Sequence, residues 1–581
     1  MAGISETPSL WILGALIAYA FTYFIYARWV DQKIWEVKED KPTPAHMYMD
    51  GVEFFPVSRY VLYGFQFKSI AALGPILGPF IGVTYGWIPA LIWIILGNMF
   101  VGWVQDYSAI MLTVRNEGKS MGPLVYEYLG EQPRKILLAY LLFYLLIISA
   151  VFIYLIGLFW TLWVGSFVAT LIVMVTALIV GQLLYKYKIN IFYTVIIAII
   201  LVIIAVIVGT GVDLYLKAQG MTKTGEFWGG WSMYVWAVVL AVFLFIAAIV
   251  SMPKFITPLN FVAFFPAIAG VIFIIIAALV SPFTGVKLIQ SAWNPEQALT
   301  LDPAKTGPIF PVLFVAIACG AISGWHSLVG TSTTGKQLDV ETDARPVGAG
   351  AMLTEGLLAT SALAAYMVVS KDVIAKGKIG AFISGAVTLT NPIFGGGAAD
   401  YLAVFYALFL VIYAFTVQIL VTRYWRIFSA ELFREGALSI LGDKYVATFI
   451  GLLIPIVFAL SGSWINLWIY FGGSNQLLAS LALMLVAVYL AKVKRPSWYA
   501  FIPAVFMTIV TLSAIFWEIV VFTWAVATGH PKAAGEIAKY PSIALALNAI
   551  FIIVGVILFI LGIIMSYYLY SRFFKFLRGE E

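Results

Sequence analysis

The stretch that decides the fold is Gly64–Gly86, which reads G-F-Q-F-K-S-I-A-A-L-G-P-I-L-G-P-F-I-G-V-T-Y-G. It stands where a membrane-crossing helix is expected, yet it contains two prolines, Pro75 and Pro79, among five glycines. Proline lacks the backbone N–H and clashes with the preceding turn, so residues 73–80 are expected to lose regular helix. The stretch predicts either a kink packed against neighbouring helices or a discontinuous helix of the kind at which transporters bind substrates.

The composition places this stretch in a polytopic α-helical membrane protein. The chain has 581 residues, of which 62% are hydrophobic and 11% charged, and its mean hydropathy is +0.99. Soluble domains are about 45–50% apolar and about 25% charged, so this chain has too few charges to cover a water-soluble surface. Long apolar runs such as Ile189–Gly209 indicate helices rather than a β-barrel. The single cysteine, Cys319, excludes an intrachain disulfide.

Apolar windows of roughly twenty residues predict about fifteen membrane crossings in a single transmembrane domain, 1–581. The apolar piece Ile379–Phe394 is expected to be a short re-entrant or surface helix. With the N-terminus outside, every arginine falls in a loop predicted to be inside, as the positive-inside rule requires. We therefore expect a multi-pass protein of the plasma or inner membrane with an outside N-terminus and a cytoplasmic C-terminus.

A second interruption lies in the span 308–330. Its end, Cys319–Gly335, reads C-G-A-I-S-G-W-H-S-L-V-G-T-S-T-T-G and combines helix-weakening glycines with hydroxyl side chains that can bond freed backbone or an ion. By the predicted topology the span 60–83 runs outward and the span 308–330 runs inward. Discontinuous helices of opposite direction are typical of inverted repeats. We interpret 60–209 as the first part of a repeat core, 308–491 as the second repeat and 498–581 as peripheral C-terminal helices.

Several motifs occur in the same order along most of the chain. They are G-x-x-F-x-S-I-A-x-x-G-P-I-x-G-P (Gly64–Pro79), G-W-x-P (Gly86–Pro89), Q-D (Gln105–Asp106), A-C-G-A-I-S-G-W-H-S (Ala318–Ser327), R-P-V-G-A-G-A-M-L-T-E-G (Arg345–Gly356) and F-G-G-S-N-Q-L-L-A (Phe471–Ala479). In these motifs the chain resembles the carbon starvation protein A family of inner-membrane transporters. The resemblance implies a core of two inverted five-helix repeats, similar to LeuT and the amino acid–polyamine–organocation superfamily. It also implies import of small peptides or pyruvate, with protons, during carbon starvation.

The chain departs from the family pattern at the first interruption. The family usually has Gly-His-His-Phe where this chain has Gly64, Phe65, Gln66 and Phe67, and Lys68 replaces a small residue. The segment 417–426 also lacks the Thr- and Asp-rich sequence of the family. These departures leave the proton route and the substrate open, and sodium coupling stays an alternative because hydroxyls and carbonyls at a broken helix suit that ion.

Lys68 and Glu355 are ionisable residues inside predicted spans. Lys68 lies about 13 Å into its span at 1.5 Å per residue, where a charge costs about 2.5–3.5 kcal/mol. It is expected either to reach the inner surface or to bind the carboxylate that peptides and pyruvate share. Glu355 can carry a coupling proton or be a structural partner of Lys68 or Arg345.

Asp106, His326 and two amide residues complete the candidates. Asp106 lies near Arg115, so a salt bridge between them is expected, with a proton relay as the alternative. His326, in the second interruption, can bind substrate or respond to pH, or it can be a satisfied polar group. Asn475 and Gln476 either line the pathway or bond neighbouring helices, whereas Glu518 is expected at the interface among tryptophans.

The sequence thus favours a secondary active transporter of small carboxylated solutes that works by alternating access. A channel is less favoured because no repeated filter is found, and no hydrolase or metalloprotease motif or P-loop indicates an enzyme. The expected partners are the substrate, a proton or sodium ion and membrane lipid, without nucleic acid, cofactor or metal. The residues expected to bind substrate are Gln66, Lys68, Gly74, Pro75, Gly78, Ser323, Gly324, His326 and Ser327, and those expected to couple ions are Glu355, Asp106, Thr331 and Ser332.

Overall fold

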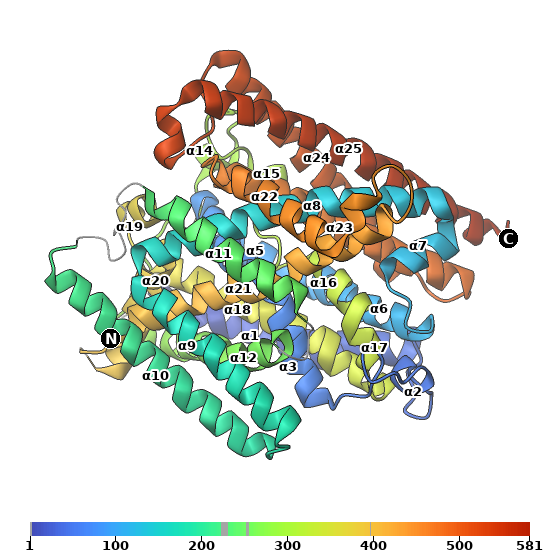
Figure 1. Cartoon of the computed structure of the whole chain (residues 1–581), viewed down its shortest axis with the longest axis horizontal. Coiled ribbons are helices and arrows are strands. Elements are labelled where there is room, and N and C mark those ends of the chain that lie inside the picture. Colours follow the sequence, from blue (N-terminus) through green and yellow to red (C-terminus); the bar gives the residue numbers. More distant parts are fainter. Residues whose placement is uncertain (1–2, 222–230, 251–254, 396, 581) are drawn as a thin grey trace.

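The computed structural model describes residues 3–221, 231–250, 255–395 and 397–580 (Figure 1). Within these ranges the chain is helical and forms no strand; one isolated bridge joins Val57 to Leu338. Thirteen helices are long and apolar enough to cross a membrane, and up to fourteen when a bent pair is counted as one span. The prediction of an all-α polytopic membrane protein is confirmed.

The elements of the first half end before the second interruption. They are α1 (Ser9–Phe21, continued by π turns to Ile34), α2 (Pro44–Met47), α3 (Arg59–Ile70), α4 (Gly74–Gly82), α5 (Trp87–Gly97), α6 (Trp103–Arg115), α7 (Met121–Leu129), α8 (Glu131–Leu162), α9 (Val164–Gly181), α10 (Ile191–Ala218), α11 (Ser232–Ile249), α12 (Ile256–Leu279), α13 (Ser281–Thr284) and α14 (Pro295–Ala298).

The second half begins with the other interrupted helix. Its elements are α15 (Ile309–Ala316), α16 (Gly324–Val329), α17 (Gly335–Gln337), α18 (Ala351–Met367), α19 (Lys371–Gly377), α20 (Ala381–Phe394), α21 (Ala399–Leu432), α22 (Lys444–Ala459), α23 (Trp464–Lys492), α24 (Trp498–Thr528) and α25 (Pro541–Arg578). A π-helical stretch, Gly330–Thr334, joins α16 to α17, so that helix runs without a gap from Gly324 to Gln337.

The buried centre of the molecule is built from the longest helices. In Figure 1, α24 and α25 form one flank, α9 and α10 form the opposite flank, and α8, α18, α21 and α23 lie between them. The apolar windows of α21 and α23 are each 94% buried, whereas that of α10 is 22% buried. A helix whose apolar surface is left uncovered by protein suits contact with lipid, and one that is covered on all sides forms the core.

The first interruption lies before the prolines and not across them. Helix α3 ends at Ile70 and α4 begins at Gly74, with a bend of 45° between the two halves. The expectation that helix is lost over 73–80 was therefore wrong in position. Pro75 stands in the first turn of α4, where a missing N–H costs no hydrogen bond and the fixed φ suits a helix start. Pro79 is accommodated inside the short helix.

The second interruption separates α15 from α16 and leaves carbonyl groups without helical partners. Side chains supply the missing donors: Trp93 Nε1 bonds Phe314 O (3.0 Å), Trp468 Nε1 bonds Ala316 O (2.9 Å), and Asn98 Nδ2 bonds Gly320 O (3.3 Å). Gln476 Nε2 reaches three carbonyls, Phe314 O (2.9 Å), Ile317 O (3.3 Å) and Ala318 O (3.4 Å). The gap in the helix is thus held by α5, α23 and the turn before α6.

Four ion pairs join segments that the predicted topology places on the same face. On the face predicted to be inside, three ion pairs join loops distant in sequence: Arg115–Glu341 (2.7 Å), Arg495–Glu36 (2.6 Å) and Lys336–Glu53 (2.6 Å). On the other face Lys217 of α10 pairs with Asp400 at the start of α21 (2.8 Å). Which face is cytoplasmic still depends on the positive-inside rule.

The segment of α19 and α20 starts and ends on the same face. Lys378, before α20, lines a cavity together with Lys305 and Lys532, both from loops predicted to be outside. After α20 the chain enters α21 at Asp400, which pairs with Lys217 of another outside loop. We therefore interpret α20 as a re-entrant helix, as predicted for 379–394, although α19 and α20 together are long enough to span.

The order of elements is the same after each interruption. After α4 come a helix with a π-helical turn, the short α7 and the 32-residue α8. After α16 and the three-residue α17 come a helix with a π-helical turn at its start, the 24-residue α19–α20 segment and the 34-residue α21. The two long helices, α8 and α21, pack along one another.

Candidate functional site

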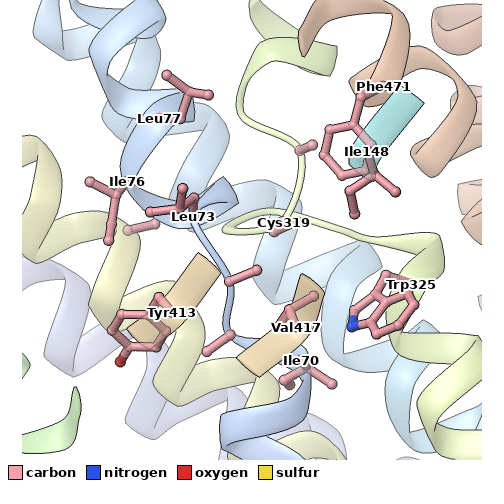
Figure 2. Close-up of a cluster of buried hydrophobic side chains, with 14 of the residues drawn as sticks. Ile70, Leu73, Ile76, Leu77, Ile148, Cys319, Trp325, Tyr413, Val417 and Phe471 are labelled. Atoms are coloured by element: carbon pink, nitrogen blue, oxygen red, sulfur yellow. The ribbon is translucent and has the colours of Figure 1, made fainter. Parts of the chain in front are cut away.

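The two interruptions touch one another at the centre of the molecule. A Cβ on Gly78 would lie 2.7 Å from Ile317 Cα and 2.8 Å from Ala316 O, closer than real Cβ atoms approach, and one on Gly74 would overlap Cys319. These glycines are therefore required for the contact. Figure 2 shows apolar side chains from both interruptions at this junction, among them Leu73 and Cys319. The expected gap for cargo is filled in this structure, so the site is closed.

Beside this junction lies a buried group of three ionisable side chains from three helices. His326 of α16 has its Nδ1 at 2.9 Å from Asp106 Oδ2 of α6, and its Nε2 at 3.1 Å from Glu355 Oε2 of α18. All three side chains are 0% exposed. Both oxygens of Glu355 and Nε2 of His326 lack a well-formed hydrogen bond within the described residues. The arrangement is a row, Asp106–His326–Glu355, whose Glu355 end has free hydrogen-bonding capacity.

Gln105 fixes the other end of this row. In the amide orientation that satisfies both of its ends, its nitrogen donates to Asp106 Oδ1 (2.7 Å) and to Ser323 O (2.9 Å). Its oxygen accepts from the Ser327 N–H (3.1 Å) in the first turn of α16. One side chain therefore holds both the acid of the row and the backbone that carries His326.

Lys68 lies at the end of α3 and is fully buried. Its Nζ donates to Thr416 Oγ1 of α21 (2.7 Å) and stands 4.6 Å from the ring centre of Tyr413. The expectation that it reaches the inner surface is therefore wrong. No carboxylate of the described residues pairs with it within 4.0 Å, although its charge interacts with that of Glu355. An ammonium group has three N–H donors, so one that bonds a hydroxyl and lies over an aromatic face can still donate to an anion.

The remaining predicted site residues take supporting positions. Gln66 Oε1 accepts from Thr334 Oγ1 (2.5 Å), and its Nε2 is an orphan within the described part of the chain. Ser323 stands directly before α16 and accepts from Asn475 Nδ2, and Gly324 packs against the α23 backbone. Ser327 and Thr331 donate to carbonyls of their own helix, Pro75 lies in the first turn of α4, and Ser332 is half-buried.

Asn475 is a structural residue of the second interruption. Its Oδ1 accepts from the Trp325 N–H (2.9 Å) and from Tyr144 Oη (3.0 Å), and its Nδ2 donates to Ser323 Oγ (2.9 Å). The alternative that Asn475 and Gln476 bond neighbouring helices is therefore confirmed for both residues.

Two expectations about charged residues were wrong. Arg115 pairs with Glu341, not with Asp106, because Asp106 faces the helix of His326 instead. Glu518 is not interfacial: it is 0% exposed, and Asn466 Nδ2 donates to its Oε2 (3.2 Å). Distance along the chain placed each residue near the end of its span, but both side chains are buried against neighbouring helices.

Sequence reasoning missed Thr416, Tyr413 and Cys319 as members of the site. Thr416 and Tyr413 carry no motif, since α21 diverges from the family pattern beside them. The Cys319 Sγ, the His326 ring and the Glu355 carboxylate place ligand atoms within 4.8 Å of one another, a grouping that could hold a metal ion. The expected absence of a metal stays a prediction.

The motifs and the paired interruptions can now be set beside known proteins. The sequence profile of the family described as carbon starvation protein CstA matches residues 8–378 and 370–514. The chain belongs to the CstA family. It is 27% identical over 552 residues to the peptide transporter CstA of Bacillus subtilis, covering 87% of this chain and 90% of that protein. It is 29% identical over 375 residues to the pyruvate/proton symporter BtsT of Escherichia coli, covering 62% of this chain and 49% of that protein.

Solved structures give a weaker likeness. MhsT in complex with L-phenylalanine aligns with 81% of this chain and 99% of its own at 13% identity, with a TM-score of 0.44. A manganese transporter of Eremococcus coleocola aligns with 89% of this chain at 12% identity, with a TM-score of 0.38. The function of this CstA family member is therefore argued from its own residues and its sequence relatives.

Proposed function

We propose that this protein is a secondary active transporter that imports small carboxylated solutes, peptides or pyruvate, together with protons. One observation carries the proposal: two interrupted helices meet at the centre of a membrane protein, and all the ionisable groups beside them are buried. Charged groups inside a membrane protein are costly and mark substrate or ion pathways. Its relatives are named as a peptide transporter and a pyruvate/proton symporter, which supports transport rather than enzymatic activity.

Lys68 is assigned to the carboxylate of the solute. It is 0% exposed, it is bonded to the Thr416 hydroxyl, and it has no carboxylate partner within 4.0 Å among the described residues. Burial without a counter-ion is expensive, so an anion that arrives beside Lys68 gains a strong, charge-assisted hydrogen bond. Pyruvate and peptides share this carboxylate.

The charges of the site suggest why a proton accompanies the solute. Asp106 and Glu355, when ionised, are balanced by Lys68 and protonated His326. A carboxylate solute adds one negative charge, and an unbalanced charge in a buried site is costly. A proton taken up by Glu355, whose oxygens have free bonding capacity within the described residues, restores the balance. We infer one proton for each carboxylate, with His326 and Asp106 positioning the carrier.

Alternating access follows from the repeated order of elements. We propose that α3–α10 and α15–α23 are the two repeats, which corresponds to the predicted 60–209 and 308–491, and that they enclose the site between their interrupted helices. The described structure is a closed state. Opening toward one side or the other requires the contact of Gly78 with Ile317 to loosen.

The experiment is uptake into proteoliposomes of labelled pyruvate and of a labelled dipeptide, under an imposed proton gradient or an imposed sodium gradient. Uptake driven by the proton gradient supports the proposal, and uptake driven only by the sodium gradient shows that sodium is the coupling ion instead. Lys68→Met, which keeps the length of the side chain and removes its charge, is expected to reduce uptake at least about a hundredfold, as the loss of a buried, charge-assisted contact does. Lys287→Met, at an exposed lysine paired with Glu6, is the matched control. Unchanged uptake by Lys68→Met removes Lys68 from the site.

A further inference from the structure

A second polar site lies away from the buried row, on the face predicted to be outside. A cavity of about 470 Å³ opens where four segments meet: the loop Ala304–Thr306, Lys378, the beginning of α23 and the loop His530–Ala534 after α24. Cavities of about 300–1,000 Å³ are the usual size for small ligands. Its walls come from parts of the sequence more than two hundred residues apart, so the fold builds this cavity and no single loop does.

The cavity is basic. Lys305, Lys378, Lys532 and His530 line it, and none of the described residues that line it is acidic. Lys532 is held in place, because its Nζ donates to Pro303 O (2.6 Å) and Ala304 O (3.0 Å) and lies 5.2 Å from the ring centre of Trp524.

Three acidic residues set the charge around the cavity. Burial lowers the pKa of the Lys532 amine, and the carboxylates of Glu518 and Asp302 oppose that effect. At the exposed rim Lys305 forms an ion pair with Glu296, with its Nζ at 3.2 Å from the carboxylate. A concave surface lined by one sign of charge concentrates ions of the other sign.

The floor of the cavity leads toward the first interruption. Trp464 lines the cavity and stacks on Phe80 of α4, with ring centres 6.3 Å apart, and on Tyr154 of α8, with ring centres 5.9 Å apart. Phe80 of α4 stands seven residues beyond Leu73, the residue directly before that helix, which corresponds to about 10 Å along the helix axis. The rings of Trp464 and Phe80 thus connect the wall of the basic cavity to α4, the helix that follows the first interruption.

We propose that this cavity is an external capture site for the carboxylate of a small organic anion, and that the Trp464–Phe80 ring pair is the barrier that the anion crosses next. The capture site rests on the proposed function only for its place on the transport route. Binding of the anion follows from the lysines and the volume of the cavity.

Reaction rates of an introduced thiol test the capture site directly, because the native cysteine, Cys319, is buried. The variant Ala533→Cys places a thiol in the cavity wall, and Ser291→Cys, at an exposed position of another loop predicted to be outside, is the matched control. The two probes are an anionic sulfonatoethyl and a cationic trimethylammonioethyl methanethiosulfonate. The ratio of the anionic to the cationic rate is expected to be about tenfold higher for Ala533→Cys than for Ser291→Cys, and pyruvate is expected to slow the reaction of Ala533→Cys alone.

The lysines provide the second comparison. Adding Lys305→Gln, Lys378→Gln and Lys532→Gln to Ala533→Cys is expected to bring the ratio down to that of the control; if this combination does not fold, Lys378→Gln alone is expected to lower it. Equal ratios in the cavity and at the control position, or no protection by pyruvate, overturn the capture site. Because the assay needs no transport, a protein that binds pyruvate here without moving it contradicts the proposed function and leaves the capture site standing.

Discussion

Replacement of Glu355 by glutamine tests the charge balance of the buried site. Glu355→Gln keeps the shape of the side chain and the 3.1 Å approach to His326 but removes the group that is proposed to carry the proton. In the proposed charge balance of Asp106, Glu355, His326 and Lys68, each carboxylate that enters needs one proton. Import of one proton with one monocarboxylate moves no net charge. A pH difference of one unit, about 1.4 kcal/mol, is then expected to concentrate pyruvate about tenfold inside the vesicle, and Glu355→Gln is expected to reach a ratio of about one.

The assay is the steady-state ratio of labelled pyruvate inside and outside proteoliposomes, with the membrane potential clamped at zero by potassium and valinomycin. Protein-free liposomes correct for diffusion of pyruvic acid. Glu518→Gln is the matched control, since Glu518 is a second carboxyl that is 0% exposed, and it lies among different neighbours. The accumulation ratio is an equilibrium quantity, so the control keeps the tenfold value even if its rate falls.

Two results would refute this reasoning. Tenfold accumulation by Glu355→Gln would show that another group carries the proton. A wild-type ratio that changes when a potential is imposed would show that net charge moves and that the count of four balanced charges is wrong.

The closed contact and the held carbonyls yield two predictions about stability, each measured by thermal unfolding in detergent. Gly78→Ala is expected to destabilise the fold by about 1–3 kcal/mol through overpacking against Ile317, whereas Gly211→Ala, with nothing within 4 Å, is expected to be neutral or slightly stabilising; equal melting of the two would contradict the close approach. Gln476→Met is expected to lower the free energy of unfolding by about 1–3 kcal/mol, because it removes the donor to Phe314 O and Ile317 O. Gln182→Met, at an exposed glutamine, is the control, and equal melting temperatures of these two variants would contradict the prediction.

The sequence was sufficient for the class of the fold and for the existence of both interruptions. Composition and apolar windows predict a polytopic helical protein because the membrane permits few alternatives. Gly and Pro mark the broken helices but not the exact break: Pro75 was expected to end helix and instead begins α4, since proline fits both roles.

Side-chain partners were less predictable than helices. Glu355 was selected for its depth in a span, His326 for its place in the second interruption and Asp106 as a carboxylate near Arg115. The structure brings the three together, but no spacing in the sequence indicates that α6, α16 and α18 converge. Lys68 is buried in the protein, in keeping with its position inside a predicted span. Its partner Thr416 carries no signal because a threonine in an apolar helix usually bonds its own backbone. The basic cavity could not be predicted from the sequence, because its lysines belong to separate loops that only the fold brings together.

The hydrogen bonds around the end of α15 bear on how the molecule can move. Hydrogen bonds from Trp93, Trp468 and Gln476 tie carbonyls of α15 to α5 and α23, and Asn98, in the turn before α6, holds Gly320 O just beyond the helix. Displacing α15 alone would strip several buried acceptors of their donors at once, each at about 1–3 kcal/mol. A rigid-body rotation that carries α5, the turn before α6 and α23 along with α15 avoids that loss. These side-chain hydrogen bonds thus favour a rigid-body motion of several packed helices over the gradual bending of one helix.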